Sequence, residues 1–172
     1  VSLISENGDM GKALSILKNE MVGSYCFTFI SDDNSVYAAR DPKGFRPMVL
    51  GHKKSDDTYI VTSESAAITA VGATLQRDVV PGELIKLSKT GLETELFSTD
   101  SSRAHCSFEF TYFAHPSSNM EGHNIYVSRK KIGQFMAKKF PIKDADLVIP
   151  VPDSARPAAL GYAQELGVSF DE

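Results

Sequence analysis

The sequence lacks the features that mark several large classes of protein. Its 172 residues include only two cysteines, Cys26 and Cys106, which form no C-x-x-C pair, so the chain has neither a disulfide framework nor a self-sufficient cysteine metal site. No basic run exceeds Arg129-Lys130-Lys131, and the formal net charge is −4, which predicts no nucleic-acid partner. No signal peptide and no apolar stretch of membrane-spanning length occurs, so we expect no membrane contact and a cytoplasmic protein.

The composition that is present is ordinary for a globular protein. Hydrophobic residues make up 42% of the chain and charged residues 23%, which is enough apolar material for a core. The pattern at Val1, Leu3 and Ile4 would open a helix, and residues 168–170 would begin a strand. Because both ends fall inside such patterns, we expect the chain to be cut from a longer protein.

The first hundred residues read mainly as antiparallel strands with minor helices. Apolar residues at helical spacing predict a helix over 9–21, and β-rich runs bounded by turns predict the strands that follow. The expected strands are 24–30, 35–40, 48–50, 58–62 and 83–87, with a short helix from Ser63–Ser65 to Val71. A polar stretch at 98–102 without periodicity predicts a domain boundary, giving domains 1–100 and 101–172.

Beyond this boundary, helices and strands alternate, so the fold class is α+β followed by α/β. An aromatic run predicts a strand over Phe108–Phe113, and an amphipathic pattern predicts a helix over 127–140. Leu147–Ile149 predicts a further strand. It is followed by a helix that begins at about Ser154, runs to Leu166 and is capped by Gly167.

The turn between that strand and that helix is a candidate anion site. Pro150 and Pro152 end the strand, Asp153 and Ser154 are favoured N-cap types, and Pro157 suits an early helical position. Unpaired backbone N–H groups and the positive end of a helix dipole meet at such a junction. The alternative is an ordinary capped strand-to-helix unit, which recurs in many α/β folds.

Three stretches of the first part closely resemble the late strands of the glutaminase domain in class II amidotransferases. They are AARDPKGFRPMVLG at 38–51, IVTSESAAI at 60–68 and RDVVPGELIKL at 77–87. The second part continues with CSFEFTYFAHPSS at 106–118, YVSRKKIGQ at 126–134 and DLVIPVPDSARPAALGYA at 146–163. The whole series, in this order, is similar to one family, the amidophosphoribosyltransferases, and covers nearly all of the chain.

This resemblance implies a fold and a reaction in two parts. Residues 1–100 would form the C-terminal part of a class II glutamine amidotransferase domain, an αββα sandwich of the N-terminal-nucleophile hydrolase type. Residues 101–172 would form the N-terminal part of a type I phosphoribosyltransferase domain. The family takes ammonia from glutamine and uses it to displace pyrophosphate from phosphoribosyl pyrophosphate, giving 5-phosphoribosylamine in the first step of purine synthesis. We therefore expect these two substrates, and also a homo-oligomer.

The resemblance also implies that no catalytic residue lies in this chain. The family's nucleophile is an N-terminal Cys whose α-amino group acts as base, whereas Val1 stands first here. The acidic pair and the mobile loop of the transferase site follow residue 172 in the family's order, so we expect this internal fragment to be inactive alone. Two alternatives stay open. A different glutamine amidotransferase would not explain the PVPDS turn, and a catalytically dead homologue would be a regulatory or phosphate-binding module.

In the resemblance, residues 150–156 fall on the loop that binds pyrophosphate. This group needs backbone N–H donors and a hydroxyl that can bond phosphate or a bound Mg²⁺, so Ser154 is the first candidate for both substrate and Mg²⁺. Asp153 would orient the loop or reach Mg²⁺ through water. Arg156 is available for a pyrophosphate oxygen.

Cys106 is a candidate iron–sulfur ligand by the same resemblance. In one branch of the family a ligand of a [4Fe–4S] cluster stands at the start of a C-x-x-E-[YF] segment, where this chain has CSFEF, and three further Cys come from later in the chain. Members without a cluster also have Cys here, so a buried free thiol is the alternative. Cys26, inside an apolar strand, is predicted to lie in the core.

Several other polar residues have a structural interpretation beside a functional one. Arg40-Asp41 and Arg46 could bind substrate, but a tight turn explains them if Asp41 accepts backbone N–H bonds and one Arg forms an ion pair. Ser63 and Ser65 could suggest a nucleophile, but helix capping explains them. The histidines at 52, 105, 115 and 123 share no metal-ligand spacing.

One loop departs from the family's pattern. The family usually has Phe-Ala-Arg-Pro-Asp-Ser where this chain has FAHPSS at 113–118, which removes a cation and an anion. If this loop joins the two active sites, their coupling would differ. Tyr112, next to it, is predicted either to contact the other domain or to lie in the core.

Overall fold

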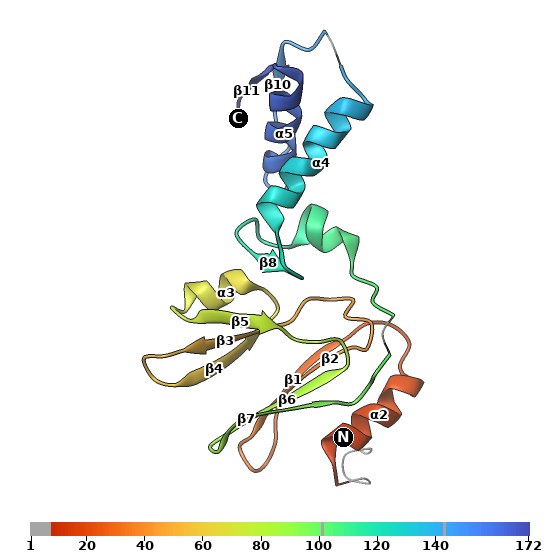
Figure 1. The fold of residues 1–172 in the computed structure, drawn as a ribbon, viewed down its shortest axis with the longest axis vertical. Coiled ribbons are helices and arrows are strands. Elements are labelled where there is room, and N and C mark those ends of the chain that lie inside the picture. The colour runs from red at the N-terminus through yellow and green to blue at the C-terminus, as the bar shows by residue number, and fades with distance from the viewer. Residues whose placement is uncertain (1–7, 101, 143) are drawn as a thin grey trace. The chain divides into compact units, whose positions relative to one another are not determined.

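The computed structural model describes residues 8–100, 102–142 and 144–172, and the chain divides into two compact units (Figure 1). The first unit contains the chain up to Cys106 except Glu64–Ala66, and the second contains these three residues and Ser107–Glu172. The helix start predicted at Val1, Leu3 and Ile4 lies outside the described residues. The boundary after residue 100 and the identities of the two domains stay predictions.

The first unit contains two antiparallel sheets. One has four strands in the order β1-β2-β6-β7, and the other has three in the order β4-β3-β5. The helices are α2 (Met10–Glu20) and α3 (Ser65–Ala70), and the strands are β1 (Cys26–Ile30), β2 (Val36–Arg40), β3 (Val49–Lys53), β4 (Thr58–Thr62), β5 (Thr74–Asp78), β6 (Glu83–Ser88) and β7 (Gly91–Leu96).

Strand alternation divides the core of this unit into two layers. Ala39 pairs with Leu84 across β2 and β6, and both pack with Leu14 of α2 in one buried cluster. The next pair along, Ala38 and Ile85, points to the opposite face and packs with buried residues of the three-stranded sheet. Successive side chains of a strand alternate between faces, so one sheet separates the helix from the second sheet.

The far face of the three-stranded sheet is covered by α3. Ile68 of α3 is fully buried, and a Cβ atom built on Gly51 of β3 would lie 2.6 Å from Ile68 Cγ2. Glycine at this position therefore lets the helix lie close to the strand. The layers of this unit follow the order helix, sheet, sheet, helix, and the αββα sandwich of the N-terminal-nucleophile hydrolase type stays a prediction.

The second unit combines helices with short strand pairs. Its elements are η1 (Glu109–Phe113), β8 (Asn119–Met120), β9 (His123–Asn124), α4 (Ile125–Lys139), β10 (Leu147–Val148), α5 (Arg156–Leu166) and β11 (Ser169–Phe170). β10 and β11 are parallel and α5 connects them, which is the βαβ arrangement expected where helices and strands alternate. Gly167 ends α5 with a φ of 71°, as predicted for its C-cap.

Helices α4 and α5 meet through their glycines. A Cβ atom on Gly133 of α4 would overlap the carbonyl oxygen of Ala158, and one on Gly161 of α5 would overlap that of Lys130. The helix backbones therefore touch at two points where no side chain would fit. Lys138 Nζ, near the end of α4, lies 3.5 Å from Glu165 Oε1, near the end of α5, and the Tyr162 hydroxyl donates to Phe140 O just after α4, so the two helices run in the same direction.

One predicted element is wrong. Residues Phe108–Phe113 were expected to form a strand, but Glu109–Phe113 form a π-helix whose closing bond runs from Ala114 N to Glu109 O at 3.1 Å. The aromatic composition favours a strand, but a buried side chain from α4, described below, binds the carbonyl groups of this segment. Four strands of the described residues were not predicted: β5 and β7, whose sequences TLQRD and GLETEL are largely polar, and the two-residue strands β8 and β9.

None of the helices in the described part of the chain is long and apolar enough to span a membrane.

The helix crossing predicts a stability effect. In Gly133→Ala the new methyl group has no space against Ala158, so we expect the free energy of unfolding to fall by about 1–3 kcal/mol, the usual cost of overpacking. Urea unfolding followed by far-UV circular dichroism measures this change. Lys131→Ala, at an exposed position of the same helix, is the control and should change stability little. Equal stabilities for the two variants would contradict the tight crossing.

Candidate functional site

The candidate anion-binding turn lies between β10 and α5. β10 ends at Val148 and α5 begins at Arg156, so the turn follows the carboxyl end of a strand in a parallel pair. Ligands in open parallel sheets bind at this end. The Asp153 side chain is 83% exposed and Ser154 is half-buried, so both can reach a ligand in solvent.

The start of α5 differs from the prediction. Ala155 is the N-cap and provides no side-chain hydrogen bond, so Asp153 and Ser154 are not the N-cap residues. Arg156 N donates to Asp153 O at 3.3 Å, and Pro157, in the first turn as predicted, has no amide hydrogen. The first turn of α5 therefore offers an anion fewer backbone N–H donors than an ordinary helix start. Further N–H donors for an anion must come from the residues between β10 and α5.

Arg156 lies between two carboxylates. Its Nη1 is 3.3 Å from Asp153 Oδ1, and its Nε is 2.6 Å from Glu172 Oε2. The first contact joins the start of α5 to the turn, and the second joins it to the segment after β11. The sequence prediction included Asp153 and Arg156, but it missed Glu172.

The turn offers a magnesium ion few protein ligands. No group of three His, Cys, Asp or Glu side chains in the described residues could hold a metal. Ser154 and Asp153 supply one hydroxyl and one carboxylate, and Mg²⁺ commonly keeps several waters and binds phosphates with only one or two protein ligands. These two residues therefore fit a magnesium ion carried by a phosphate ligand, but not a site made of protein alone.

Cys106 does not fit an iron–sulfur cluster with the residues of this chain. Its side chain is buried, and its backbone N donates to Phe45 O at 3.0 Å. The second cysteine, Cys26, is half-buried at the core between the sheets, with Sγ 3.7 Å from Pro47 O. A [4Fe–4S] cluster needs four thiolates, so three would have to come from outside these 172 residues.

The Arg40-Asp41 turn makes structural contacts, and Asp41 accepts backbone N–H bonds as predicted, whereas the bonds shown for Arg40 go to carbonyl oxygens and not to the carboxylate of the predicted ion pair. Asp41 Oδ1 accepts from Lys43 N at 3.0 Å, and Oδ2 accepts from Phe45 N at 3.1 Å. The Arg40 guanidinium, 1% exposed, donates to the carbonyl oxygens of Arg46, Val79 and Gly44 at 2.6–2.9 Å. Since a buried cation needs such partners, Arg40 holds the turn in place.

A pocket of about 860 Å³ lies next to this turn in the first unit. Its lining includes Tyr25, Asp41, Lys43 and Phe45. The Tyr25 hydroxyl is buried and has no hydrogen-bond partner in the described part of the chain. Burial, and to a smaller extent the charge of Asp41, raise the pKa of Tyr25 to about 12.

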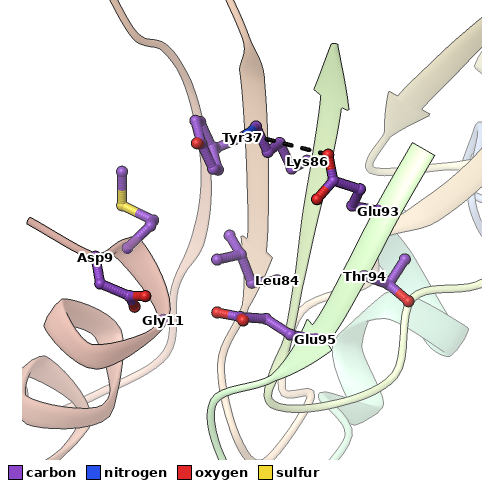
Figure 2. Close-up of a pocket in the computed structure, with 9 residues that line it drawn as sticks. Asp9, Gly11, Tyr37, Leu84, Lys86, Glu93, Thr94 and Glu95 are labelled. Atoms are coloured by element: carbon purple, nitrogen blue, oxygen red, sulfur yellow. Dashed lines mark ion pairs between the residues drawn. The ribbon is translucent and has the colours of Figure 1, made fainter. Parts of the chain in front are cut away.

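A second pocket, of about 250 Å³, lies between the start of α2 and the four-stranded sheet (Figure 2). Figure 2 shows the Glu95 carboxylate pointing toward Gly11, where a side chain would overlap it. A carboxylate near the N-terminus of a helix is favourable. Lys86 Nζ lies 4.0 Å from Glu93 Oε1. The Glu95 carboxylate therefore stabilises the start of α2, and the Lys86–Glu93 pair links β6 to β7.

Arg129 of α4 holds the π-helix η1. It is 2% exposed, and its guanidinium donates to Phe110 O at 2.7 Å, Ala114 O at 2.8 Å and Glu109 O at 3.4 Å. Burial lowers the pKa of Arg129, and the Glu64 carboxylate opposes this shift. These bonds satisfy carbonyl groups that a strand would have paired with a neighbouring strand.

Glu64 fixes the loop that departs from the family pattern. Glu64 Oε2 accepts from His115 N at 2.7 Å and from Ser118 Oγ at 2.8 Å. Ser65 Oγ accepts from Asn119 N at 2.7 Å, and Ser118 Oγ accepts from Ala66 N at 3.3 Å. The serines at 65 and 118 therefore bind segments more than 50 residues apart in the sequence. No local sequence signal predicts these pairs.

The remaining candidates are distributed over the two units. Tyr112 is 62% exposed, so it is not a core residue, and its ring lies 5.4 Å from that of Phe113. Three histidines form hydrogen bonds: His52 with Asp57, His105 with Gly44 O and His115 with Ser117.

No family model matches the chain, but the similar curated proteins and the similar solved structures point to the same family. The amidophosphoribosyltransferase of Mycobacterium bovis is 43% identical over 150 residues, which are 87% of this chain and 28% of that protein. The chain spans about a third of the length of the curated relatives that it matches.

Two solved structures match almost the whole chain at 35% sequence identity. One is described as the structure of the allosteric regulatory enzyme of purine biosynthesis, with a TM-score of 0.90 over 99% of this chain and 36% of that one. The other is the glutamine phosphoribosylpyrophosphate amidotransferase from B. subtilis complexed with ADP and GMP, with a TM-score of 0.89 over 98% of this chain and 37% of that one.

Because the Tyr25 hydroxyl has no hydrogen-bond partner among the described residues, we expect its removal to cost little stability. In Tyr25→Phe the free energy of unfolding should stay within about 1 kcal/mol of the wild type, because no internal hydrogen bond is lost. Urea unfolding measures this, with Tyr112→Phe as the exposed control. A loss well above that figure would show that the hydroxyl has a partner.

The raised pKa of Tyr25 predicts a pH dependence. The pKa of the tyrosine is 10 in the unfolded chain and about 12 in the folded one. The folded state therefore favours the protonated hydroxyl, and this preference stabilises the fold fully below pH 10 and is lost as the pH rises toward 12. Urea midpoints measured from pH 9 to pH 11.5 should fall more steeply for the wild type than for Tyr25→Phe. Parallel curves would contradict the shift.

The Arg129 contacts predict a large loss of stability on truncation. Arg129→Met keeps much of the side-chain volume but leaves buried carbonyl groups without donors, so we expect a loss of about 2–4 kcal/mol. Urea unfolding followed by near-UV circular dichroism, to which the three aromatic residues of η1 contribute, measures this loss. Lys131→Met, at an exposed position of α4, removes the same charge and should be nearly neutral. A similar result for both variants would mean that the carbonyl groups find other donors.

Proposed function

Because this chain belongs to the amidophosphoribosyltransferase family and spans about a third of the length of its relatives, we propose that it serves the reaction of that family. In this reaction glutamine and water yield glutamate and ammonia, and the ammonia displaces pyrophosphate from phosphoribosyl pyrophosphate. The products are 5-phosphoribosylamine, glutamate and pyrophosphate, and the reaction opens purine synthesis. Identities of 35–43% over 87–99% of the chain support this proposal.

The two units would serve the two half-reactions. Residues 1–100 would form the C-terminal part of the glutaminase domain, which the helix-sheet-sheet-helix order of the first unit supports. Residues 101–172 would form the start of a type I phosphoribosyltransferase domain, which the parallel β10-α5-β11 unit supports. The predicted cytoplasmic location and self-association stay predictions.

The substrate proposal rests on the position of the turn 150–156. This turn stands at the carboxyl end of a parallel strand, and Ser154 and Arg156 lie two residues apart within it. Ser154 would donate its hydroxyl hydrogen to a pyrophosphate oxygen, and backbone N–H groups of the turn would bind further oxygens. Arg156 would contact the same group only after giving up part of its contact with Asp153 or Glu172.

Magnesium would be held at this turn by Ser154 together with the substrate's own oxygens. When bound, Mg²⁺ would neutralise part of the negative charge on the departing pyrophosphate. Asp153 would reach the ion through water, because its carboxylate also lies 3.3 Å from Arg156. In this arrangement the chain's own groups bind and orient the leaving group.

The chain would not complete either half-reaction alone. Its glutaminase-like turn at Arg40-Asp41 forms structural contacts, and the family's N-terminal Cys has no counterpart among residues 1–172. Cys106 contributes to the packing of the first unit, and we assign no step to an iron–sulfur cluster.

The turn assignment predicts that Ser154→Ala weakens binding of Mg²⁺-phosphoribosyl pyrophosphate. Loss of a hydrogen bond to a charged oxygen should raise the dissociation constant by roughly tenfold or more. Isothermal titration calorimetry with and without Mg²⁺ measures this change, and Ser107→Ala, an exposed serine of the same unit, is the control. In an enzyme that carries this segment, glutamine hydrolysis without the second substrate should stay the same. An unchanged affinity would contradict the assignment of the turn.

A further inference from the structure

We propose that Glu172 is a positioning residue that competes with pyrophosphate for Arg156 and so limits how strongly the turn 150–156 binds an anion. This inference rests on the proposed function of the turn. Glu172 belongs to none of the motifs that identify the turn in the sequence, and its effect would act through Arg156 and not through direct contact with the ligand.

The fold brings Glu172 to the turn. β10 and β11 are parallel, with Leu147 paired to Ser169 and Val148 to Phe170. Asp171 N donates to Val148 O at 3.2 Å and extends this register beyond β11. The residues that follow the two strands therefore emerge at the same edge, where ligands bind in parallel sheets.

The two contacts of Arg156 differ in geometry and exposure. The Glu172 contact is short, 2.6 Å from Nε to Oε2, and the Glu172 side chain is 47% exposed. The Asp153 contact is longer, 3.3 Å, and the Asp153 side chain is 83% exposed. Because a shorter and less solvated ion pair is less screened, Glu172 is the stronger partner of the guanidinium.

This arrangement opposes the binding of a polyanion. One guanidinium faces two carboxylates, so the three side chains together carry one net negative charge. A pyrophosphate oxygen that bonds Arg156 must displace Glu172 or share the guanidinium with it. Removing the charge of Glu172 while keeping its shape would release Arg156 for the ligand and should strengthen binding.

The test is a titration of the 172-residue chain with magnesium pyrophosphate, followed by the backbone amide NMR signals of residues 153–156. Glu172→Gln should bind about threefold more tightly than the wild type at low ionic strength, since exposed ion pairs are weak, and salt should reduce the gain. In the Arg156→Gln background the same substitution should give no gain, which is the non-additivity of a residue that acts through another.

Glu165→Gln is the matched control. It removes the same charge from α5, where Glu165 pairs with Lys138 at 3.5 Å, and should leave the affinity unchanged. If the wild-type signals do not shift, the turn is not a pyrophosphate site and both proposals fail. If the wild type binds but Glu172→Gln matches Glu165→Gln or binds more weakly, the role of Glu172 alone is wrong. A gain that persists without Arg156 would also overturn it, because it would show direct repulsion.

Discussion

Each unit of this protein depends on one buried guanidinium that binds backbone carbonyl groups. Arg40 fixes the 41–46 turn in the first unit, and Arg129 fixes the π-helix in the second, each through three carbonyl oxygens. Both side chains are almost fully buried. Buried carbonyl groups and a buried cation are each costly without partners. Their pairing lets irregular backbone lie inside a packed unit, and the regular elements are arranged around it.

The regular elements place the proposed functions at the ends of strands. In the first unit, alternation along β2 and β6 gives one sheet two buried faces, so helix and second sheet can pack on opposite sides. In the second unit, the short parallel pair and its connecting helix bring the turn 150–156 and Glu172 to one edge. The first arrangement supports a sandwich and the second an anion site, which together are the combination that the proposed reaction requires.

Local patterns in the sequence predicted most helices and several strands, because periodicity and turn residues act over a few positions. The helix ending at Gly167 and the turn at Asp41 follow directly from such signals. The segment Phe108–Phe113 was misread because its conformation depends on Arg129, about 20 residues away. Glu172 was missed for a similar reason, since only the pairing of β10 with β11 brings it to Arg156. The prolines and N-cap residue types located the turn and the family resemblance proposed its ligand, but the charge balance around it required coordinates.

The crossing of α4 and α5 has a consequence for motion. At Gly133 and Gly161 the helix backbones touch directly, so no side chain there can change rotamer to let one helix slide or rotate against the other. Close-packed backbones resist such displacement more than interdigitated flexible side chains do. The two helices should therefore move as one rigid body. If the turn closes around a ligand, residues 150–155 must change their own backbone conformation, while Arg156 stays in place with α5.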